Sequence, residues 1–246
     1  GFNFNFAPVG DINNNPKNPV INVRSYSENP EIVAEYMVEA VKGYHDAKMM
    51  TSVKHFPGHG DTAVDSHIGL PIVDFDQERL DKVELVPFKK MVELDLPGIM
   101  ASHVLYTKYD DKYPATLSKK LVQGLLRDEI GYDGLVVTDS LTMKAVFNNY
   151  TLEEIVLNGF NSGDDILLLC GARDIKLQTD FYETAIRLVK EGKISEAKID
   201  ESVNRILKYK QQFIREMDEN FDCIKDQLCI KDAVELAEKV SLDSIT

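Results

Sequence analysis

The feature of this sequence that most constrains its fold is a repeated alternation of short apolar runs and longer amphipathic segments. Residues 49–56, 98–103, 134–139 and 165–170 form such runs, and a segment with helical spacing of apolar residues follows each of them. Runs of this kind are typical of strands buried on both faces, as in a parallel sheet covered by helices. The sequence therefore predicts an α/β protein with a parallel sheet.

The first strand is expected at 2–9, where the opening residues FNFNF alternate between apolar and polar. Ser27 and Asn29 are candidate N-caps for a helix that begins with Pro30 and continues to about Tyr44. Further helices are expected at 77–94, 118–130, 141–161, 174–191, 196–215 and 232–242.

Polar residues with reactive side chains stand at the ends of three apolar runs: Lys54 and His55, His103, and Asp139. In a (β/α)8 barrel the carboxyl ends of the strands converge on one face, which favours a barrel over an open doubly wound sheet. The chain offers only about five strands where a barrel has eight. We therefore expect a TIM-type (β/α)8 barrel that lacks its first two or three βα units, formed by residues 1–215. Residues 216–246 are expected to be a C-terminal arm or linker.

The charge balance argues against two classes of partner. The chain contains 28 Lys and Arg residues against 41 Asp and Glu residues, a net charge of −13, which suits neither nucleic acid nor an anionic membrane. No apolar stretch approaches the roughly 20 residues needed to span a bilayer. Three cysteines suggest no disulfide framework and favour a reducing, cytoplasmic compartment, although a signal peptide upstream of Gly1 would direct the protein to secretion. Localisation and oligomeric state stay open.

The densest group of chemically active residues follows the run at 49–56. Residues 54–62 read KHFPGHGDT and residues 65–67 read DSH, so three of the five histidines lie in this histidine loop. One interpretation is a metal site, with His55, His59, Asp61, Asp65 and His67 as possible ligands, although their spacing matches no strong metal motif. The other is acid–base catalysis, because Asp65 and His67 lie on the same side of an extended loop and a carboxylate orients a neighbouring imidazole.

Asp139 follows a buried strand directly, which is a catalytic position in a barrel. The same residue is equally well placed to cap the helical segment that begins near Leu141. Position and spacing alone leave both alternatives open.

The histidine loop resembles the signature of the β-N-acetylglucosaminidases of glycoside hydrolase family 3. The resemblance extends, in the family's order, to FAPVGD at 6–11, VRSY at 23–26, ASHV at 101–104 and TDSLTM at 138–143. It implies a TIM-type barrel and a retaining mechanism without a cofactor or metal. The family's Asp-x-Glu-Gly-Gly-Arg segment does not occur in this chain. Residues 235–242 resemble the start of a linker toward a second domain, so we expect the chain to be incomplete at both ends.

The resemblance also implies roles for individual residues. Asp139 matches the nucleophile, His67 the general acid/base, and Asp65 the partner of that histidine. The residues expected to bind the sugar are Lys54, His55, Arg24, Asp11, His103 and Met143.

The implied activity is the release of terminal β-linked N-acetylglucosamine from saccharides derived from peptidoglycan or chitin. A carbohydrate substrate is therefore the expected partner. A neutral His67 repels an incoming anion less than a carboxylate does, so a phosphorylase that uses the same residues is the alternative. A metal-dependent barrel hydrolase and a non-catalytic sugar-binding fragment are the remaining interpretations.

Overall fold

The computed structural model describes residues 2–94, 97–170, 175–214 and 230–244. The chain divides into two compact units, residues 2–213 and the segment from Ile214 onward, which we describe separately. The described part of the second unit consists mainly of one amphipathic helix, α9 (Lys231–Asp243). The predicted domain boundary at residues 215–216 stays a prediction.

The first unit is built around a parallel sheet whose strand order is β1-β2-β4-β6. These strands are β1 (Phe4–Asn5), β2 (Met50–Phe56), β4 (Gly98–Ala101) and β6 (Leu135–Thr138). Val53 pairs with Ile99, and Ile99 pairs with Val136, so the apolar residues of the three central runs stand in register. The predicted parallel α/β sheet is confirmed. Closure into a barrel stays a prediction, since the described residues place four strands in this sheet.

Two of the predicted strands are shorter than expected. The segment at 165–170 contributes an isolated bridge between Ile166 and Val137, because later backbone N–H groups are taken by side chains. Leu168 N–H donates to Thr138 Oγ1 at 2.9 Å and Cys170 N–H donates to Ser140 Oγ at 3.0 Å, which replaces a regular ladder. At the start of the chain, the strand expected at 2–9 is reduced to β1 and a bridge at Val9.

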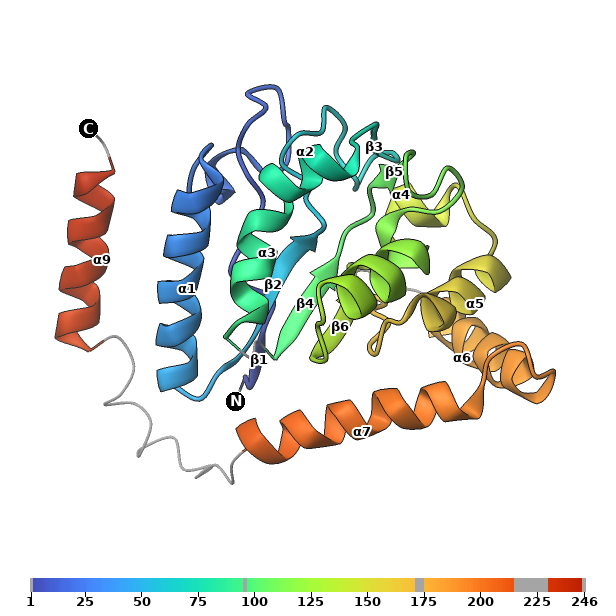
Figure 1. Ribbon diagram of the computed structural model, residues 1–246. Helices are drawn as coiled ribbons and strands as arrows, with labels where there is room; N and C mark the ends of the chain where they lie inside the picture. Colours follow the sequence, from blue (N-terminus) through green and yellow to red (C-terminus); the bar gives the residue numbers. More distant parts are fainter. Residues whose placement is uncertain (1, 95–96, 171–174, 215–229, 245–246) are drawn as a thin grey trace. The chain divides into compact units, whose positions relative to one another are not determined.

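Helices cover the sheet in the order that the apolar spacing predicts (Figure 1). They are α1 (Pro30–Asp46), α2 (Gln77–Lys82), α3 (Leu85–Val92), the π-helix η3 (Lys120–Glu129), α4 (Lys144–Phe147), α5 (Leu152–Ser162), α6 (Ile175–Lys190) and α7 (Glu196–Phe213), with short 3-10 turns η1 (Asn22–Arg24) and η2 (Ala115–Leu117). Asn29 caps α1 as predicted, since its side chain accepts from the N–H groups of Glu31 and Ile32. The helix predicted at 77–94 is divided in two, and the buried Glu84 between the halves pairs with Arg79 at 2.8 Å.

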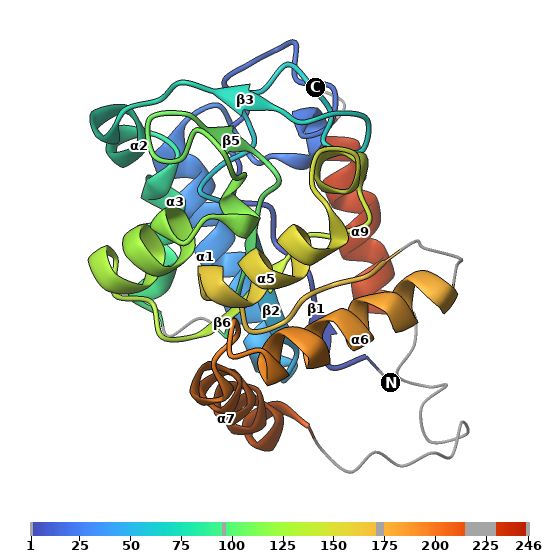
Figure 2. The same cartoon turned by 90° about the vertical axis from the view of Figure 1, so that its right-hand side faces the viewer.

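The main core lies between one face of the sheet and α1, α3 and η3. Val53, Ile99 and Val136 pack there against helical residues such as Met37 and Phe88, all fully buried. Figures 1 and 2 show α1 and α3 side by side over the sheet. A separate cluster joins Tyr209 and Phe213 of α7 to Met50 and Leu135, the first residues of β2 and β6. Helix α7 therefore covers the amino ends of the strands and leaves their carboxyl ends to the loops.

A second, two-stranded parallel sheet was not predicted. It consists of β3 (Ile72–Val73) and β5 (Leu105–Tyr106), whose two-residue strands are too short to produce a periodic signal. Figure 1 places it near the carboxyl ends of β2 and β4. In the described part of the chain, no helix is long and apolar enough to cross a bilayer.

Candidate active site

The end of β2 brings two neighbouring side chains to one place. Lys54 pairs with Met100, but the next pair along the strand joins Phe56 to Ala101, so His55 is an extra residue in β2. Such a bulge redirects side chains locally, whereas neighbours in a regular strand point to opposite faces. Lys54 and His55 accordingly line the same cavity.

This cavity has a volume of about 150 Å³ and lies at the carboxyl ends of the strands. Its lining residues are Val20, Ile21, Arg24, Lys54, His55, His59, Ser66, His67 and Asp139. The predicted nucleophile, the predicted acid/base and three of the predicted sugar-binding residues are therefore brought together from distant parts of the sequence.

Four of the predicted site residues do not line the cavity. Asp65 contacts His67, and Asp11 lies buried beneath His55. His103 is buried, and its Nε2–H donates to the Ser140 carbonyl at 2.9 Å. Met143 is buried just before α4. The sugar-binding roles of Asp11, His103 and Met143 stay predictions.

Asp139 is the carboxylate of the cavity. Its side chain is 22% exposed, its Oδ2 lies 4.0 Å from His55 Nε2, and its Oδ1 accepts from Ser140 N–H at 2.7 Å. Partial burial raises the pKa of Asp139, but His103, His55, the Ser140 N–H and Lys54 together outweigh it and lower that pKa. Asp139 is therefore ionised at neutral pH, the state required of a nucleophile.

Asp11, on the buried side of His55, fixes the orientation of its ring. This fully buried carboxylate accepts from His55 Nδ1–H at 2.6 Å, from His55 N–H at 3.2 Å and from His59 N–H at 2.6 Å. Burial raises the pKa of Asp11, but the charge and hydrogen bonds of the two histidines prevail and lower it. Because His55 Nδ1 is engaged with Asp11, its Nε2 faces Asp139.

His67 and Asp65 form a hydrogen-bonded pair in the histidine loop. Asp65 Oδ1 accepts from the ring Nδ1–H and from the backbone N–H of His67, both at 2.8 Å. Burial raises the pKa of Asp65, yet these two bonds lower it overall. With Nδ1–H held by the carboxylate, His67 Nε2 is left to exchange a proton with a ligand. The His67 side chain is 62% exposed, so a ligand in the cavity can reach it.

Two cationic residues complete the polar lining. Burial and the nearby Arg24 lower the pKa of Lys54, against the opposing effect of Asp139 and Asp11. Arg24 donates from Nη1 to the Val20 carbonyl at 3.1 Å, which fixes the guanidinium at the cavity edge. Lysine and arginine donors beside a carboxylate suit the hydroxyl groups of a polar, uncharged ligand.

No separate signal in the sequence indicates the roles of His59 and Ser66. His59 entered only as a possible metal ligand, but its ring contacts Thr62 Oγ1 at 2.9 Å and Ser66 Oγ at 3.0 Å. The buried Asn18 donates to the carbonyls of His59 and Gly60, both at 2.8 Å, and so supports the loop. Among the residues that the structure describes, no three His, Cys, Asp or Glu side chains gather as metal ligands.

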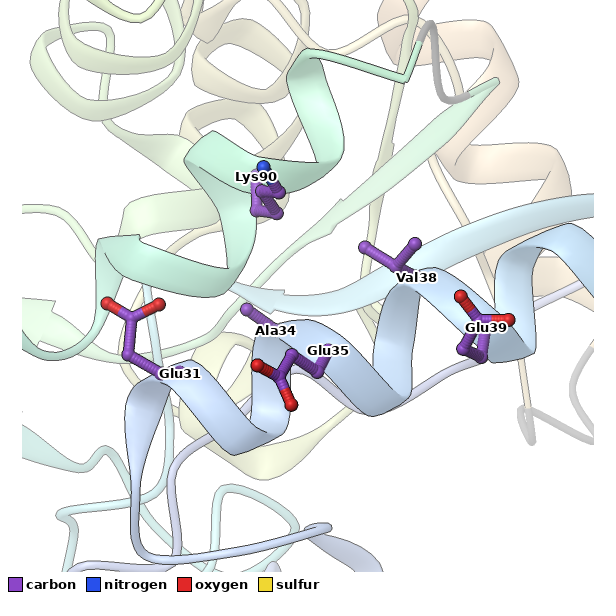
Figure 3. A pocket seen from close by; sticks show the side chains of 6 residues that line it. All are labelled: Glu31, Ala34, Glu35, Val38, Glu39 and Lys90. Carbon is purple, nitrogen blue, oxygen red and sulfur yellow. The ribbon is translucent and has the colours of Figure 1, made fainter.

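A larger hollow of about 550 Å³ lies between α1 and α3, on the outer helical layer (Figure 3). Its lining residues are Glu31, Ala34, Glu35, Val38, Glu39 and Lys90. None of them stands at a strand end or belongs to the histidine loop, so we place the chemistry in the smaller cavity.

Known proteins resemble this chain over most of its length. Residues 1–209 match the family model of the glycosyl hydrolase family 3 N-terminal domain. Beta-hexosaminidase A of Pseudoalteromonas piscicida is 38% identical over 226 residues, which cover 85% of this chain and 38% of the relative.

Solved structures of two β-N-acetylglucosaminidases are also similar to this chain. A glycoside hydrolase family 3 β-N-acetylglucosaminidase from Paenibacillus sp. strain FPU-7 matches with a TM-score of 0.88 at 42% identity, over 97% of this chain and 45% of that chain. The β-N-acetylglucosaminidase from Thermotoga maritima matches with a TM-score of 0.75 at 38% identity, over 85% of this chain and 44% of that chain. This chain thus spans less than half the length of these relatives.

Proposed function

Since this chain belongs to glycoside hydrolase family 3, we propose that it carries the catalytic residues of a retaining β-N-acetylglucosaminidase. One observation carries the proposal: Asp139, an ionised carboxylate, and His67, which is paired with Asp65, line the same small cavity. The names of the relatives, a beta-hexosaminidase and two β-N-acetylglucosaminidases, support the choice of sugar.

In the first step, Asp139 attacks the anomeric carbon of a terminal N-acetylglucosamine residue while protonated His67 gives its proton to the leaving oxygen. The glycosidic C–O bond breaks as the bond to the carboxylate forms. In the second step, neutral His67 takes a proton from water, which attacks the anomeric carbon and releases Asp139. Asp65 stabilises the charged form of the imidazole and holds its ring in place.

Arg24, Lys54 and His55 are the proposed contacts to the sugar hydroxyl groups, because all three line the cavity that contains Asp139. The saccharides that supply the terminal sugar would be fragments of peptidoglycan or chitin. We propose water as the acceptor in preference to phosphate, since the relatives described above bear the names of glycosidases.

The decisive experiment traps the covalent intermediate. The protein is incubated with a fluorinated N-acetylglucosaminide that forms the glycosyl-enzyme quickly and loses it slowly, and the labelled peptide is identified by mass spectrometry. We expect one adduct, on Asp139, and none in the Asp139→Asn variant. Asp133→Asn serves as the control, because the Asp133 side chain is 84% exposed just before β6. An active protein labelled at another residue would contradict the mechanism.

A further inference from the structure

The Asp65–His67 pair is held together by bonds within its own turn. In addition to the two bonds from His67, the Asp65 carbonyl accepts from the N–H groups of Ile68 and Gly69 at 2.9 and 3.0 Å. These contacts define the shape of the turn. They do not determine where the turn lies relative to Asp139, so its position depends on other contacts.

Ser66, between the two members of the pair, connects the turn to the rest of the site. It is only 3% exposed, and its Oγ lies 3.0 Å from His59 Nε2. The Ser66 carbonyl accepts from Ala145 N–H at 3.2 Å, in the segment that follows Asp139. Ser66 therefore links the turn both to the histidine loop and to the chain beyond the nucleophile.

One arrangement of protons satisfies the contacts around His59. In it the Thr62 hydroxyl donates its one proton to the His59 carbonyl at 3.1 Å, and Thr62 Oγ1 accepts from His59 Nδ1–H at 2.9 Å. A neutral ring with its proton on Nδ1 offers a lone pair at Nε2, to which the Ser66 hydroxyl donates. Burial and the neighbouring His55 lower the pKa of His59, which agrees with a neutral ring. The His59 N–H donates to the buried Asp11 and so anchors the arrangement beneath the cavity.

We propose that His59 and Ser66 are positioning residues, whose hydrogen bond sets the place of the Asp65–His67 pair beside the cavity that contains Asp139. This inference rests on the proposed function, in which His67 is the general acid/base. Loss of the His59–Ser66 bond leaves the Asp65–His67 bond and the backbone bond from Ala145 to Ser66 intact, but it releases the side of the turn that faces His59. Proton transfer to the leaving group then suffers, whereas attack by Asp139 does not.

The test is Ser66→Ala in the full chain, assayed as kcat/KM on two N-acetylglucosaminides, one with a phenol of low pKa as leaving group and one with an aliphatic alcohol. We expect a loss of about tenfold on the alkyl glycoside, in keeping with one hydrogen bond that acts in the transition state. The aryl glycoside needs little protonation and should lose less than about twofold. In the His67→Ala background, Ser66→Ala should cause no further loss, because the residue that it positions is gone.

Ser162→Ala is the matched control. It removes the same hydroxyl from a buried, hydrogen-bonded serine in α5 and should leave the ratio of the two rates unchanged. A readout independent of activity is hydrogen–deuterium exchange of the peptide at 61–70, which should rise in Ser66→Ala and stay at the wild-type level in Ser162→Ala.

Equal rate losses on both substrates, an additive double variant or unchanged exchange at 61–70 would overturn the positioning role. A wild-type chain without glycosidase activity would instead contradict the proposed function. In that case the exchange measurement still decides whether Ser66 anchors the turn.

Discussion

Replacing Asp11 by Asn tests how the charge of this buried carboxylate holds His55 and His59, and it changes only one atom of the side chain that contacts them. Both backbone N–H groups, from His55 and His59, donate to Asp11 Oδ1, and Asn retains an oxygen at this position. The Asp11 Oδ2 atom, which accepts from His55 Nδ1–H at 2.6 Å, is replaced by an NH2 group. Two donors then face each other in a fully buried location.

The size of the effect follows from the bond that is lost. A buried hydrogen bond to a charged group contributes roughly 1.5–3 kcal/mol, so the free energy of unfolding should fall by about that amount near neutral pH. His55 can avoid the clash only by moving its proton from Nδ1 to Nε2, which changes what its ring presents to Asp139. The variant should therefore lose activity even where it stays folded.

The effect should depend on pH in a definite direction. The pKa of Asp11 in the folded protein lies below its ordinary value of 3.8, because the attraction of His55 and His59 outweighs burial. A carboxyl group of this kind stabilises the fold above its ordinary pKa, and the contribution disappears as the pH falls through the lowered folded value. The difference between the wild type and Asp11→Asn is thus largest near neutral pH and shrinks in acid.

The assay is urea denaturation followed by far-UV circular dichroism at several pH values, since the chain has no tryptophan to serve as a fluorescent probe. The exposed Asp133→Asn variant should differ from the wild type by less than about 0.5 kcal/mol. A loss for Asp11→Asn that is equally small at neutral pH, or one that stays constant into the acid range, would refute the argument.

Three further outcomes are expected. His67→Ala should slow the cleavage of alkyl glycosides at least about a hundredfold while sparing substrates with very good leaving groups, and equal losses in kcat/KM would contradict the general-acid role. Products formed in phosphate buffer should be free N-acetylglucosamine, and activity should be retained after chelator treatment. A sugar phosphate detected by NMR would favour the phosphorylase, and activity lost with chelator and restored by zinc would favour the metal-dependent hydrolase. Gly60→Ala should destabilise the fold by several kcal/mol in urea denaturation, since a Cβ there would lie 1.7 Å from the Ile12 carbonyl oxygen. Gly43→Ala is the control: a Cβ at this position in α1 meets nothing within 4 Å, and the substitution should stabilise the fold by roughly 0.5–1 kcal/mol.

The sheet could be predicted because its signal is local. Buried central strands require apolar side chains on both faces, and the runs that contain Val53, Ile99 and Val136 satisfy this requirement. The strand expected at 165–170 is shortened to a bridge at Ile166, because the N–H groups of Leu168 and Cys170 donate to the side chains of Thr138 and Ser140, and no periodic pattern records such bonds.

The same contrast applies to single residues. Cys170 ends an apolar run, a position that indicates a buried core thiol, but its side chain is exposed at the end of that irregular segment. Burial of Asp11 also has no sequence signal, since an aspartate after a short strand is more often a turn residue. In both cases contacts between distant parts of the sequence decide whether the side chain is buried or exposed.

The site combines residues that are positioned in two different ways. Lys54 and Asp139 stand at strand ends, so the backbone ladder of the sheet fixes them, and their place could be inferred from the order of apolar runs. His67 lies on a loop whose position depends on side-chain hydrogen bonds through Ser66 and His59. Perturbations of the loop should therefore affect proton transfer before they affect nucleophilic attack. In the proposed mechanism, the proton transfers by His67 are therefore more sensitive to sequence changes at 57–69 than the attack by Asp139 is.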